Sequence, residues 1–561
     1  MMDDVEIMLQ GKVFSYFPVS QRELDDAIDR TTKPLYLFKI TNKDLSFAET
    51  HTKGLRKSRG TDNLHTMYFK ALMNGNQDVL DIGSGSIFFR KHKIVYTEEQ
   101  LQRGHHHEML KDKFSYPIIS KRRYAFDKFQ LHLSVTMNYN TDKNKDINPI
   151  VNAYLKESNA THIIGIDRGE RHLLYLSLID LHGNIVEQYS LNEIVNEYKG
   201  NTYSTNYRDL LDAKEKQRDE ARRSWQTIEN IKDLKEGYMS QVIHKIANLM
   251  VKYNAIVVLE DLNLGFMRGR QKVEKQVYQK FEKMLIDKLN YLVDKRLEFN
   301  DLGGVLKAYQ LTNTEKMFSQ QYRNNKNTLG KQCGFLYYIP AWNTSKMDPT
   351  TGFVNLLDTR YENMAKAKAF FAKFRSIRYN AIKGWFEFTF DDDDFTTKAS
   401  GTRTKWTLCT YGTRIETKRD PKQNNNFTSE EFDLTDRFKE FLAKYHIDFG
   451  GNLMEQICSQ DDVTFFKELL HLLHLTLQMR NSITGTDVDY LISPVINANG
   501  DFYDSRKCGK NLPQNADANG AYNIARKGLW IIEQIKQSKD LSKLKLAIGN
   551  KDWLRYAQRL T

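Results

Sequence analysis

Three acidic residues stand where a charged carboxylate is costly to keep. Asp167 ends the apolar run IIGID, Glu260 ends the apolar run IVVLE, and Asp517 opens the amphipathic run DANGAYNIA. A carboxylate at the end of a buried strand loses hydration, and a bound divalent cation offsets that cost. Mg²⁺ prefers oxygen ligands, and two such ions about 4 Å apart promote in-line phosphodiester hydrolysis. The three acids are therefore candidate catalytic ligands for two Mg²⁺ ions, with Mn²⁺ as an alternative metal.

Taken singly, each acid has a simpler interpretation as a helix cap or a surface strand end. Their order along the chain favours the metal site. The first acid follows a strand that opens a meander, the second ends a later buried strand, and the third opens a late helix. This order is typical of an RNase H-like fold, so we expect an α+β, multidomain chain with a mixed sheet flanked by helices.

Strand and helix patterns supply the elements that would position these acids. Residues 36–139 alternate apolar and polar positions and predict a β-rich first unit, and the polar run NTDKNKDIN at 140–148 marks its end. Residues 163–191 predict a three-stranded meander around a turn at 181–184. Helical spacing over 211–250 predicts a long helix.

The rest of the chain first alternates strand and helix, and the pattern of predicted elements then changes. The run AIVVLEDL at 255–262 predicts a strand buried on both faces, and residues 272–293 predict a helix. Residues 331–513 contain the strand-like runs FLYYIP, WFEFTF and KWTLCTYG and the helical run FKELLHLLHLTLQMR. We interpret them as an inserted α+β unit, after which an amphipathic helix closes the sheet.

The residues around the acids resemble a known family. IIGIDRGERHLLYLSLID, the run beginning IVVLEDLNLGFMRGRQKVEKQVYQKF, and ADANGAYNIARKGL resemble, in order, the three RuvC-like segments of subtype V-A CRISPR effector nucleases, the Cpf family. The resemblance extends from about residue 36 to the carboxyl end. It implies that Asp167, Glu260 and Asp517 are catalytic and metal-binding. The family usually has DADANGAY, so Asn515 removes a neighbouring negative charge, and we expect somewhat weaker metal affinity.

The end of the inserted unit resembles the Nuc domain of that family. The run LQMRNSITGTDVDYLISPV carries Arg480, Ser482 and Asp489, which match family residues that assist cleavage. An arginine beside a metal site can hold a phosphate through two parallel hydrogen bonds. Without the resemblance, Arg480 would be interpreted as an arginine at a helix end facing solvent.

Two further segments resemble parts of the family that contact RNA or the recognition lobe. The run EARRSW resembles the bridge helix, in which Trp225 would dock into that lobe. The first unit resembles the wedge domain, which grips the guide RNA through interleaved basic and aromatic residues. The resemblance implies RNA binding by Lys121, Arg122, Arg123 and Tyr124. Precursor-RNA processing is in doubt, because a family lysine aligns with Ser120 and the loop with the catalytic histidine is shortened.

The resemblance also predicts domains and partners. Residues 1–35 form an N-terminal segment that is poorly assigned. We expect a wedge-like RNA-binding domain at 36–158, a bridge helix at 205–236 and a Nuc-like insertion at 331–513. The RuvC-like segments are expected at 159–204, 237–330 and 514–561. The expected activity is that of a metal-dependent DNA endonuclease guided by CRISPR RNA. The expected partners are guide RNA, target DNA and a separate polypeptide carrying the recognition lobe, whose sequence is not recognisable before residue 36.

Composition agrees with a nucleic-acid partner. The formal net charge is +12 and the isoelectric point is about 9.1, a balance that favours polyanions. The four cysteines lie dozens of residues apart, which predicts neither a zinc site nor a disulfide framework. No signal peptide or run of about 18 apolar residues is evident. We therefore expect a soluble protein without a membrane partner, and the resemblance implies a cytoplasmic, prokaryotic one.

Three alternatives stay open. The run DVLDIGSGS at 78–86 resembles the first motif of S-adenosylmethionine-dependent methyltransferases, although Ile87 replaces the third glycine and strand-like residues follow. A second alternative is a non-cleaving nucleic-acid-binding remnant, against which the presence of all three acids argues. A third is a guide-independent nuclease like transposon-encoded relatives, whose zinc-ribbon cysteines this chain lacks.

Overall fold

The computed structural model divides the chain into two compact units, one of residues 1–140 and 295–307 and one of 141–294 and 308–561. It describes residues 13–14, 22, 67, 80–90, 128–137, 148–168, 172–198, 200–224, 231–261, 272–289, 292–298, 301, 303–304, 306, 332–396, 401–420, 426–483, 486 and 488–559. The two units are considered separately below.

The described part of the first unit is an antiparallel sheet. Strands β1 (Val13–Phe14), β2 (Leu80–Arg90) and β3 (Lys128–Met137) pair in that order, with an irregularity between Ile82 and Gly85. The run DIGSGS lies inside β2, whose pairing with β3 resumes at Gly85 and continues to Arg90. A methyltransferase motif would need a glycine-rich loop that leads into a helix, so the methyltransferase alternative is wrong.

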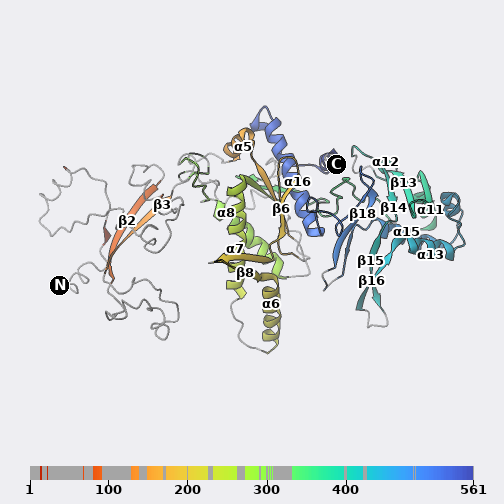
Figure 1. Ribbon diagram of the computed structural model, residues 1–561, viewed down its shortest axis with the longest axis horizontal. Coiled ribbons are helices and arrows are strands. Elements are labelled where there is room, and N and C mark those ends of the chain that lie inside the picture. The colour runs from red at the N-terminus through yellow and green to blue at the C-terminus, as the bar shows by residue number, and fades with distance from the viewer. Residues whose placement is uncertain are drawn as a thin grey trace. The chain divides into compact units, whose positions relative to one another are not determined.

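A six-stranded mixed sheet forms the centre of the second unit (Figure 1). Its order is β10 (Gln332–Cys333), β11 (Leu336–Ile339), β9 (Ala255–Glu260), β4 (His162–Asp167), β5 (Tyr175–Ile179) and β6 (Ile185–Ser190). Strands β4, β5 and β6 are the expected meander, and β9 is buried throughout, as its apolar sequence predicts. Strand β9 runs parallel to both β4 and β11. This mixed sheet suits the expected core.

Helix α16 (Ala516–Gln537) packs directly on this sheet because glycines remove side chains at the contact. A Cβ built on Gly165 of β4 would lie 2.2 Å from the carbonyl oxygen of Ala521, and one on Gly528 would lie 2.5 Å from Val258. Both distances are far below van der Waals contact. Any larger residue at these positions would push the helix away from the strands.

The other helices of the second unit include α5 (Asn148–Glu157), α6 (Tyr207–Ser224), α7 (Ile231–Tyr253), α8 (Lys272–Leu289), the short η5 (Leu541–Lys543) and α17 (Asn550–Arg559). Helices α6 and α7 account for the described part of 211–250, where helical spacing predicts a long helical segment, and residues 225–230 between them lie outside the described residues. The hairpin of β7 (Glu193–Tyr198) and β8 (Asn201–Asn206) was not expected. Gly200, with a φ of 80°, provides the turn that the sequence signals there.

Residues between β11 and α16 form three smaller sheets with helices beside them. The strands are β12 (Ser376–Asn380), β13 (Trp385–Asp391) and β14 (Lys405–Cys409), then β15 (Thr413–Asp420) with β16 (Asn426–Asp433), and β17 (Arg480–Ser482), β18 (Asp489–Ile496) and β19 (Phe502–Asp504). The helices are α11 (Met364–Phe371), α12 (Asp392–Phe395), α13 (Leu434–Lys444), α14 (Leu453–Cys458) and α15 (Val463–Leu477).

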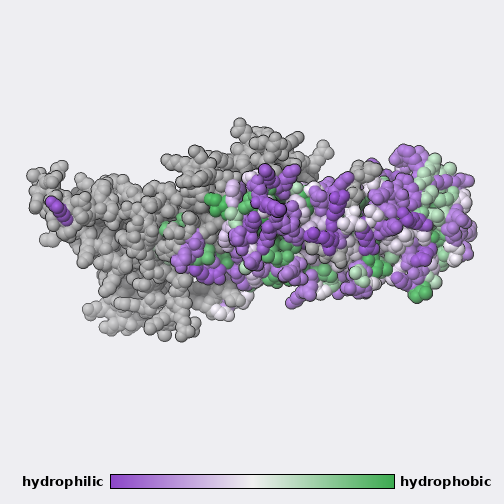
Figure 2. All heavy atoms as spheres, turned by 90° about the horizontal axis from the view of Figure 1, so that it is seen from above, coloured by the Kyte–Doolittle hydropathy of each residue, from purple (hydrophilic) through white to green (hydrophobic). Residues whose placement is uncertain are grey.

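This part has its own aromatic core, built around Phe371, Phe374, Phe388, Trp406 and Phe466, all of them buried. It therefore has the α+β character that the sequence predicts for an insertion. No helix among the described residues has the length and apolar character needed to cross a lipid bilayer. Hydrophilic side chains dominate the described surface in Figure 2.

Candidate active site

Asp167 and Glu260 lie at the same end of two adjacent parallel strands. Strands β4 and β9 pair in register up to Ile166 and Leu259, so the next positions on the two strands are Asp167 and Glu260. Side chains alternate between the faces of a sheet, and Gly165 and Val258 both face α16. Two residues further along each strand, Asp167 and Glu260 must therefore face α16 as well.

Asp517 comes to the same place from the first turn of α16. Asn515 caps this helix by accepting a hydrogen bond from the backbone N–H of Ala518 at 2.8 Å, and its Nδ2 donates to the Tyr175 hydroxyl at 3.3 Å. The backbone N–H of His172 donates to Asp517 Oδ2 at 3.3 Å. Asn515 thus has a structural role as a helix cap. Its effect on metal affinity stays a prediction.

The three carboxylates are buried and act on one another. Their relative exposures are 9% for Asp167, 8% for Glu260 and 2% for Asp517. Burial raises the pKa of Asp167 well above its ordinary value, and the charges of Glu260 and Asp517 raise it further. Burial also raises the pKa of Glu260 and that of Asp517. Concentrated, poorly hydrated negative charge of this kind favours a cation.

A loop after β11 supports Glu260. The Thr344 hydroxyl donates a hydrogen bond to Glu260 Oε1 and lies 3.3 Å from the carbonyl oxygen of Ala341. The hydrogen bond from Thr344 opposes the rise in the pKa of Glu260. Thr344 was not identified from the sequence, because nothing in the surrounding residues signals a contact with a strand 84 residues earlier.

A polar stripe on α16 holds that loop in place. Asn519, Asn523 and Lys527 recur every four residues, which places them on one helix face, and all are buried. Asn519 Nδ2 donates to the carbonyl oxygens of Ser345 (3.2 Å) and Met347 (2.9 Å). Asn523 Nδ2 donates to the carbonyl oxygen of Thr344 at 2.9 Å.

Lys527 extends the stripe to the beginning of the loop. Its Nζ donates to the carbonyl oxygens of Pro340 and Trp342 at 2.7 and 3.0 Å. Burial lowers the pKa of Lys527 to about 7, and the charge of Glu260 opposes that change. The polar stripe was not identified from the sequence, although polar residues that recur every four positions in an otherwise apolar helix can indicate such a stripe. It links the helix of Asp517 to the loop that orients Glu260.

Arg480 connects the part of the chain between β11 and α16 to the acids. Its guanidinium donates two hydrogen bonds to Asp489, each 3.0 Å long, and its Nη2 lies 3.3 Å from Asp517 Oδ1. Arg480 lies in β17, so the alternative of a helix-end arginine is wrong. Ser482 is exposed and pairs in register with Asp489 across β17 and β18. The structure thus places Arg480 and Asp489 beside the carboxylates, with Ser482 at the end of the same strand as Arg480.

Arg168 also holds the strand ends, although no sequence pattern singled it out. Its backbone N–H donates to Asp167 Oδ1 at 2.9 Å. Its guanidinium pairs with Glu282 of α8 and donates to the carbonyl oxygen of Glu260. Arg168 therefore ties the ends of β4 and β9 together.

The donor set suits a divalent cation in its chemistry, although the side chains do not form a closed cage. Among the described residues, no group of three or more His, Cys, Asp or Glu side chains is arranged to hold a metal ion. Each carboxylate is instead held by a protein donor, namely Arg168 N–H, Thr344 or Arg480. The three carboxylates offer only oxygen ligands, are buried and repel one another. Such a set of ligands suits Mg²⁺ or Mn²⁺.

Gly520 shows how tightly the acids are packed. A Cβ built on Gly520 of α16 would lie 2.2 Å from Asp167 Oδ2. The carboxylate of Asp167 can face the helix only because position 520 has no side chain. This contact gives a physical reason for glycine in the run DANGAY.

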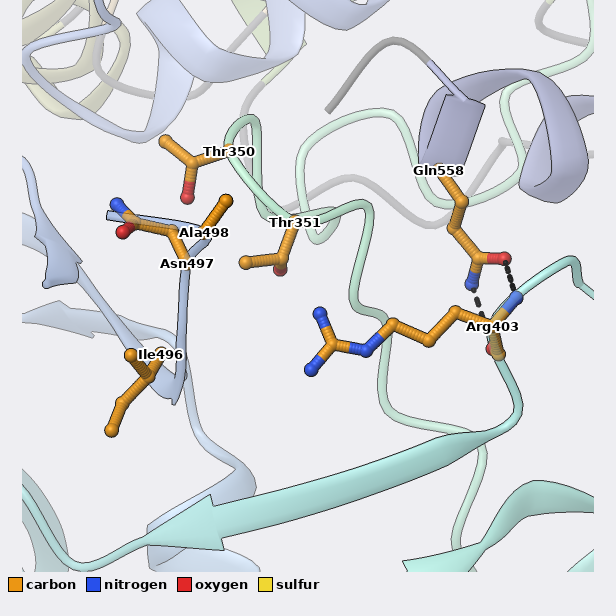
Figure 3. Close-up of a pocket in the computed structure, with 7 residues that line it drawn as sticks. All are labelled: Thr350, Thr351, Arg403, Ile496, Asn497, Ala498 and Gln558. Carbon is orange, nitrogen blue, oxygen red and sulfur yellow. Dashed lines mark hydrogen bonds between the residues drawn. The ribbon is translucent and has the colours of Figure 1, made fainter. Parts of the chain in front are cut away.

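A cavity of about 290 Å³ is lined by Thr350, Thr351, Arg403, Ile496, Asn497, Ala498 and Gln558 (Figure 3). Gln558 fixes its edge by accepting a hydrogen bond from the backbone N–H of Arg403 at 3.0 Å. None of the candidate catalytic residues lines it. Trp225 and the candidate RNA-binding residues Lys121, Arg122, Arg123 and Tyr124 lie outside the described residues, so their roles stay predictions.

One comparison with known proteins bears on this geometry. A family model described as the RuvC nuclease domain matches residues 141–561, which include the mixed sheet, the α+β part between β11 and α16, and α16 itself. The match covers well over half of the chain and contains all three acids. The mixed α+β architecture is compatible with an RNase H-like core of this family. The chain therefore belongs to the RuvC nuclease domain family and carries a nuclease domain that acts on nucleic acid.

Proposed function

We propose that the chain is a divalent-metal-dependent endonuclease that hydrolyses single-stranded DNA under the direction of a CRISPR guide RNA. The observation that carries the chemistry is the convergence of Asp167, Glu260 and Asp517 from two neighbouring strand ends and one helix start. Family membership supports a nuclease, and the resemblance to subtype V-A effectors supports the guide, the DNA substrate and a Nuc-like role for residues 331–513.

The residues of the site have separate roles in this proposal. Asp167, Glu260 and Asp517 would hold two Mg²⁺ ions, with Mn²⁺ as a substitute. Bound divalent cations supply positive charge where negative charge develops on the attacking, leaving and non-bridging oxygens. Arg480 would bind a phosphate oxygen, since its side chain is 40% exposed and its guanidinium is already oriented by Asp489. Thr344 and Arg168 would keep the carboxylates in place.

Neutral replacements of similar shape test the chemistry. Asp167→Asn, Glu260→Gln and Asp517→Asn should each abolish Mg²⁺-dependent cleavage of a labelled single strand and reduce the binding of Mn²⁺ measured by electron paramagnetic resonance. Asp392→Asn, a buried carboxylate in the short helix α12, is the matched control and should retain both. Cleavage that survives all three site changes would contradict the assignment.

The guide is tested separately. The full chain, with and without a guide RNA, is presented with matching and non-matching single strands. Cleavage restricted to the matching strand in the presence of the guide supports the proposal. Equal cleavage of both strands without RNA would make the protein a guide-independent nuclease, and binding without any cleavage would make it a non-cleaving nucleic-acid-binding protein.

A further inference from the structure

The hairpin of β15 and β16 is anchored beside the strand that carries Arg480. The backbone N–H of Ile415 donates to Asn481 Oδ1 at 3.0 Å, and Gln478 Nε2 donates to the carbonyl oxygen of Ile415 at 2.9 Å. Asn481 lies between Arg480 and Ser482 in β17 and is fully buried. The base of the hairpin is thus fixed to the rim of the candidate active site.

The far end of the same hairpin exposes an aromatic side chain next to a cation. Phe427 is 64% exposed, and the guanidinium of its cross-strand partner Arg419 lies 5.1 Å from the centre of its ring. Figure 1 shows the two strands projecting from the surrounding elements. Phe427 is the one exposed large hydrophobic side chain among the described residues of β15 and β16, whereas a site for another folded protein needs a larger apolar patch.

Charge along the hairpin changes from base to tip. Among the described side chains, the cations nearest the far end of the hairpin are Lys418 and Arg419, and Lys418 pairs with Glu416, which leaves the Arg419 guanidinium beside Phe427. The acids nearer the base are neutralised by partners. Glu416 pairs with Lys418 and His471, Glu430 pairs with Arg437, and Glu431 lies 3.6 Å from Arg506.

We propose that the tip of this hairpin binds single-stranded nucleic acid, with a base stacked on Phe427 and a phosphate held by Arg419. Every base has a flat face that stacks on an aromatic ring, and an adjacent arginine adds attraction to the ring and to the backbone. The occupant is the substrate strand itself, so this inference rests on the proposed function.

The length of the hairpin determines which nucleotide of the bound nucleic-acid strand contacts Phe427. Arg419 lies four positions beyond Ile415 in β15, and a β-strand rises about 3.4 Å per residue, so Arg419 is roughly 14 Å from Ile415 at the base. A stacked strand rises about 3.4 Å per nucleotide. The contact should therefore fall roughly four nucleotides from the part of the strand nearest Arg480.

Binding measured without divalent ions separates this inference from the chemistry. The full chain in EDTA is titrated with a fluorescent single-stranded oligonucleotide. Phe427→Ala should weaken binding roughly 5- to 100-fold, whereas Phe427→Tyr should bind nearly as well as the wild type. Ile382→Ala is the matched control, because Ile382 is 99% exposed on another turn, and it should change nothing. Arg419→Gln should reduce the slope of log affinity against log salt by about one.

The outcomes are distinct. If Phe427→Ala binds the oligonucleotide as strongly as Ile382→Ala does, the inference is overturned, even if the chain cleaves DNA. An equal loss on duplex DNA would also overturn it, because paired bases are not free to stack on Phe427. If the chain does not cleave DNA but Phe427→Ala still weakens its binding of single strands, the hairpin contact is supported and the proposed chemistry is contradicted.

Discussion

Arg480 and Asp517 lie 3.3 Å apart and join the part of the chain between β11 and α16 to the helix that packs on the central sheet. The same guanidinium makes two hydrogen bonds to Asp489, so one side chain fixes the relation between β17, β18 and α16. Burial alone would lower the pKa of Arg480, but the hydrogen bond to Asp489 and the charge of Asp517 raise it. Arg480 is therefore a permanent cation beside three carboxylates.

Arg480→Lys tests whether the planar guanidinium matters. A lysine keeps the charge but loses the paired geometry, and we expect kcat/KM for cleavage to fall roughly 10- to 100-fold. Arg506→Lys is the matched control, since Arg506 makes an equivalent two-point contact with Asp504 and is similarly exposed. Equal losses in both variants, measured by steady-state kinetics, would argue for a structural role only.

Gly520→Ala tests the close contact between α16 and Asp167. The added methyl group must displace the carboxylate, so we expect cleavage to be nearly lost and the free energy of unfolding to fall by about 1–3 kcal/mol. Gly237→Ala provides the contrast, because nothing lies within 4 Å of a Cβ at that position in α7. It should raise the free energy of unfolding by about 0.5–1 kcal/mol in urea denaturation and leave cleavage unchanged. A Gly520→Ala protein with normal activity would show that the contact is unimportant.

Thr344→Val removes the hydroxyl that supports Glu260 at almost constant volume. Because a displaced catalytic group can cost up to about 100-fold in rate, we expect kcat to fall roughly 10- to 100-fold with little change in KM. Thr344→Ser should restore most of the rate. Thr476→Val removes another buried hydroxyl, bonded to the carbonyl oxygen of Leu472 in α15, and should affect stability alone. If Thr344→Ser is as slow as Thr344→Val, the hydrogen bond is not the cause.

Asp392 should make stability depend on pH. Burial raises the pKa of Asp392 to about 6, opposed by the hydrogen bond from Trp406. Because the folded pKa exceeds the unfolded value of about 3.9, the stability contributed by the protonated group is complete below about pH 4 and is lost as pH rises through about 6. Asp392→Asn stays neutral, so its free energy of unfolding relative to wild type should increase by about 1–2 kcal/mol between pH 4 and pH 7.

Urea denaturation at several pH values measures this difference. Asp394→Asn, an exposed neighbour in the same helix, serves as the control. A constant difference between Asp392→Asn and wild type across that pH range would contradict the assignment.

The sequence predicts the local elements well and the long-range contacts poorly. The apolar runs that end in Asp167 and Glu260 predict buried strands, and the run from Asp517 predicts a helix. Asn515 could have been identified as a cap, because asparagine before a helix is a common N-terminal signal. Thr344 and the carbonyl groups that bind Asn519 and Lys527 could not be paired from sequence, since more than 170 residues separate the loop from α16.

The inserted part shows the same limit. Its strands WFEFTF and KWTLCTYG and its helix α15 follow from local patterns, whereas the pairing of Arg480 with Asp517 depends on how distant elements pack. The resemblance placed Arg480 near the acids, and the structure provides the hydrogen-bonding partners.

The most direct test is a crystal structure of the full chain soaked with Mn²⁺ and a short single-stranded oligonucleotide. Anomalous scattering should show metal ions about 2.0–2.2 Å from carboxylate oxygens of Asp167, Glu260 and Asp517, with a phosphate beside them. Metal peaks elsewhere, or carboxylates that share no ion, would contradict the central claim.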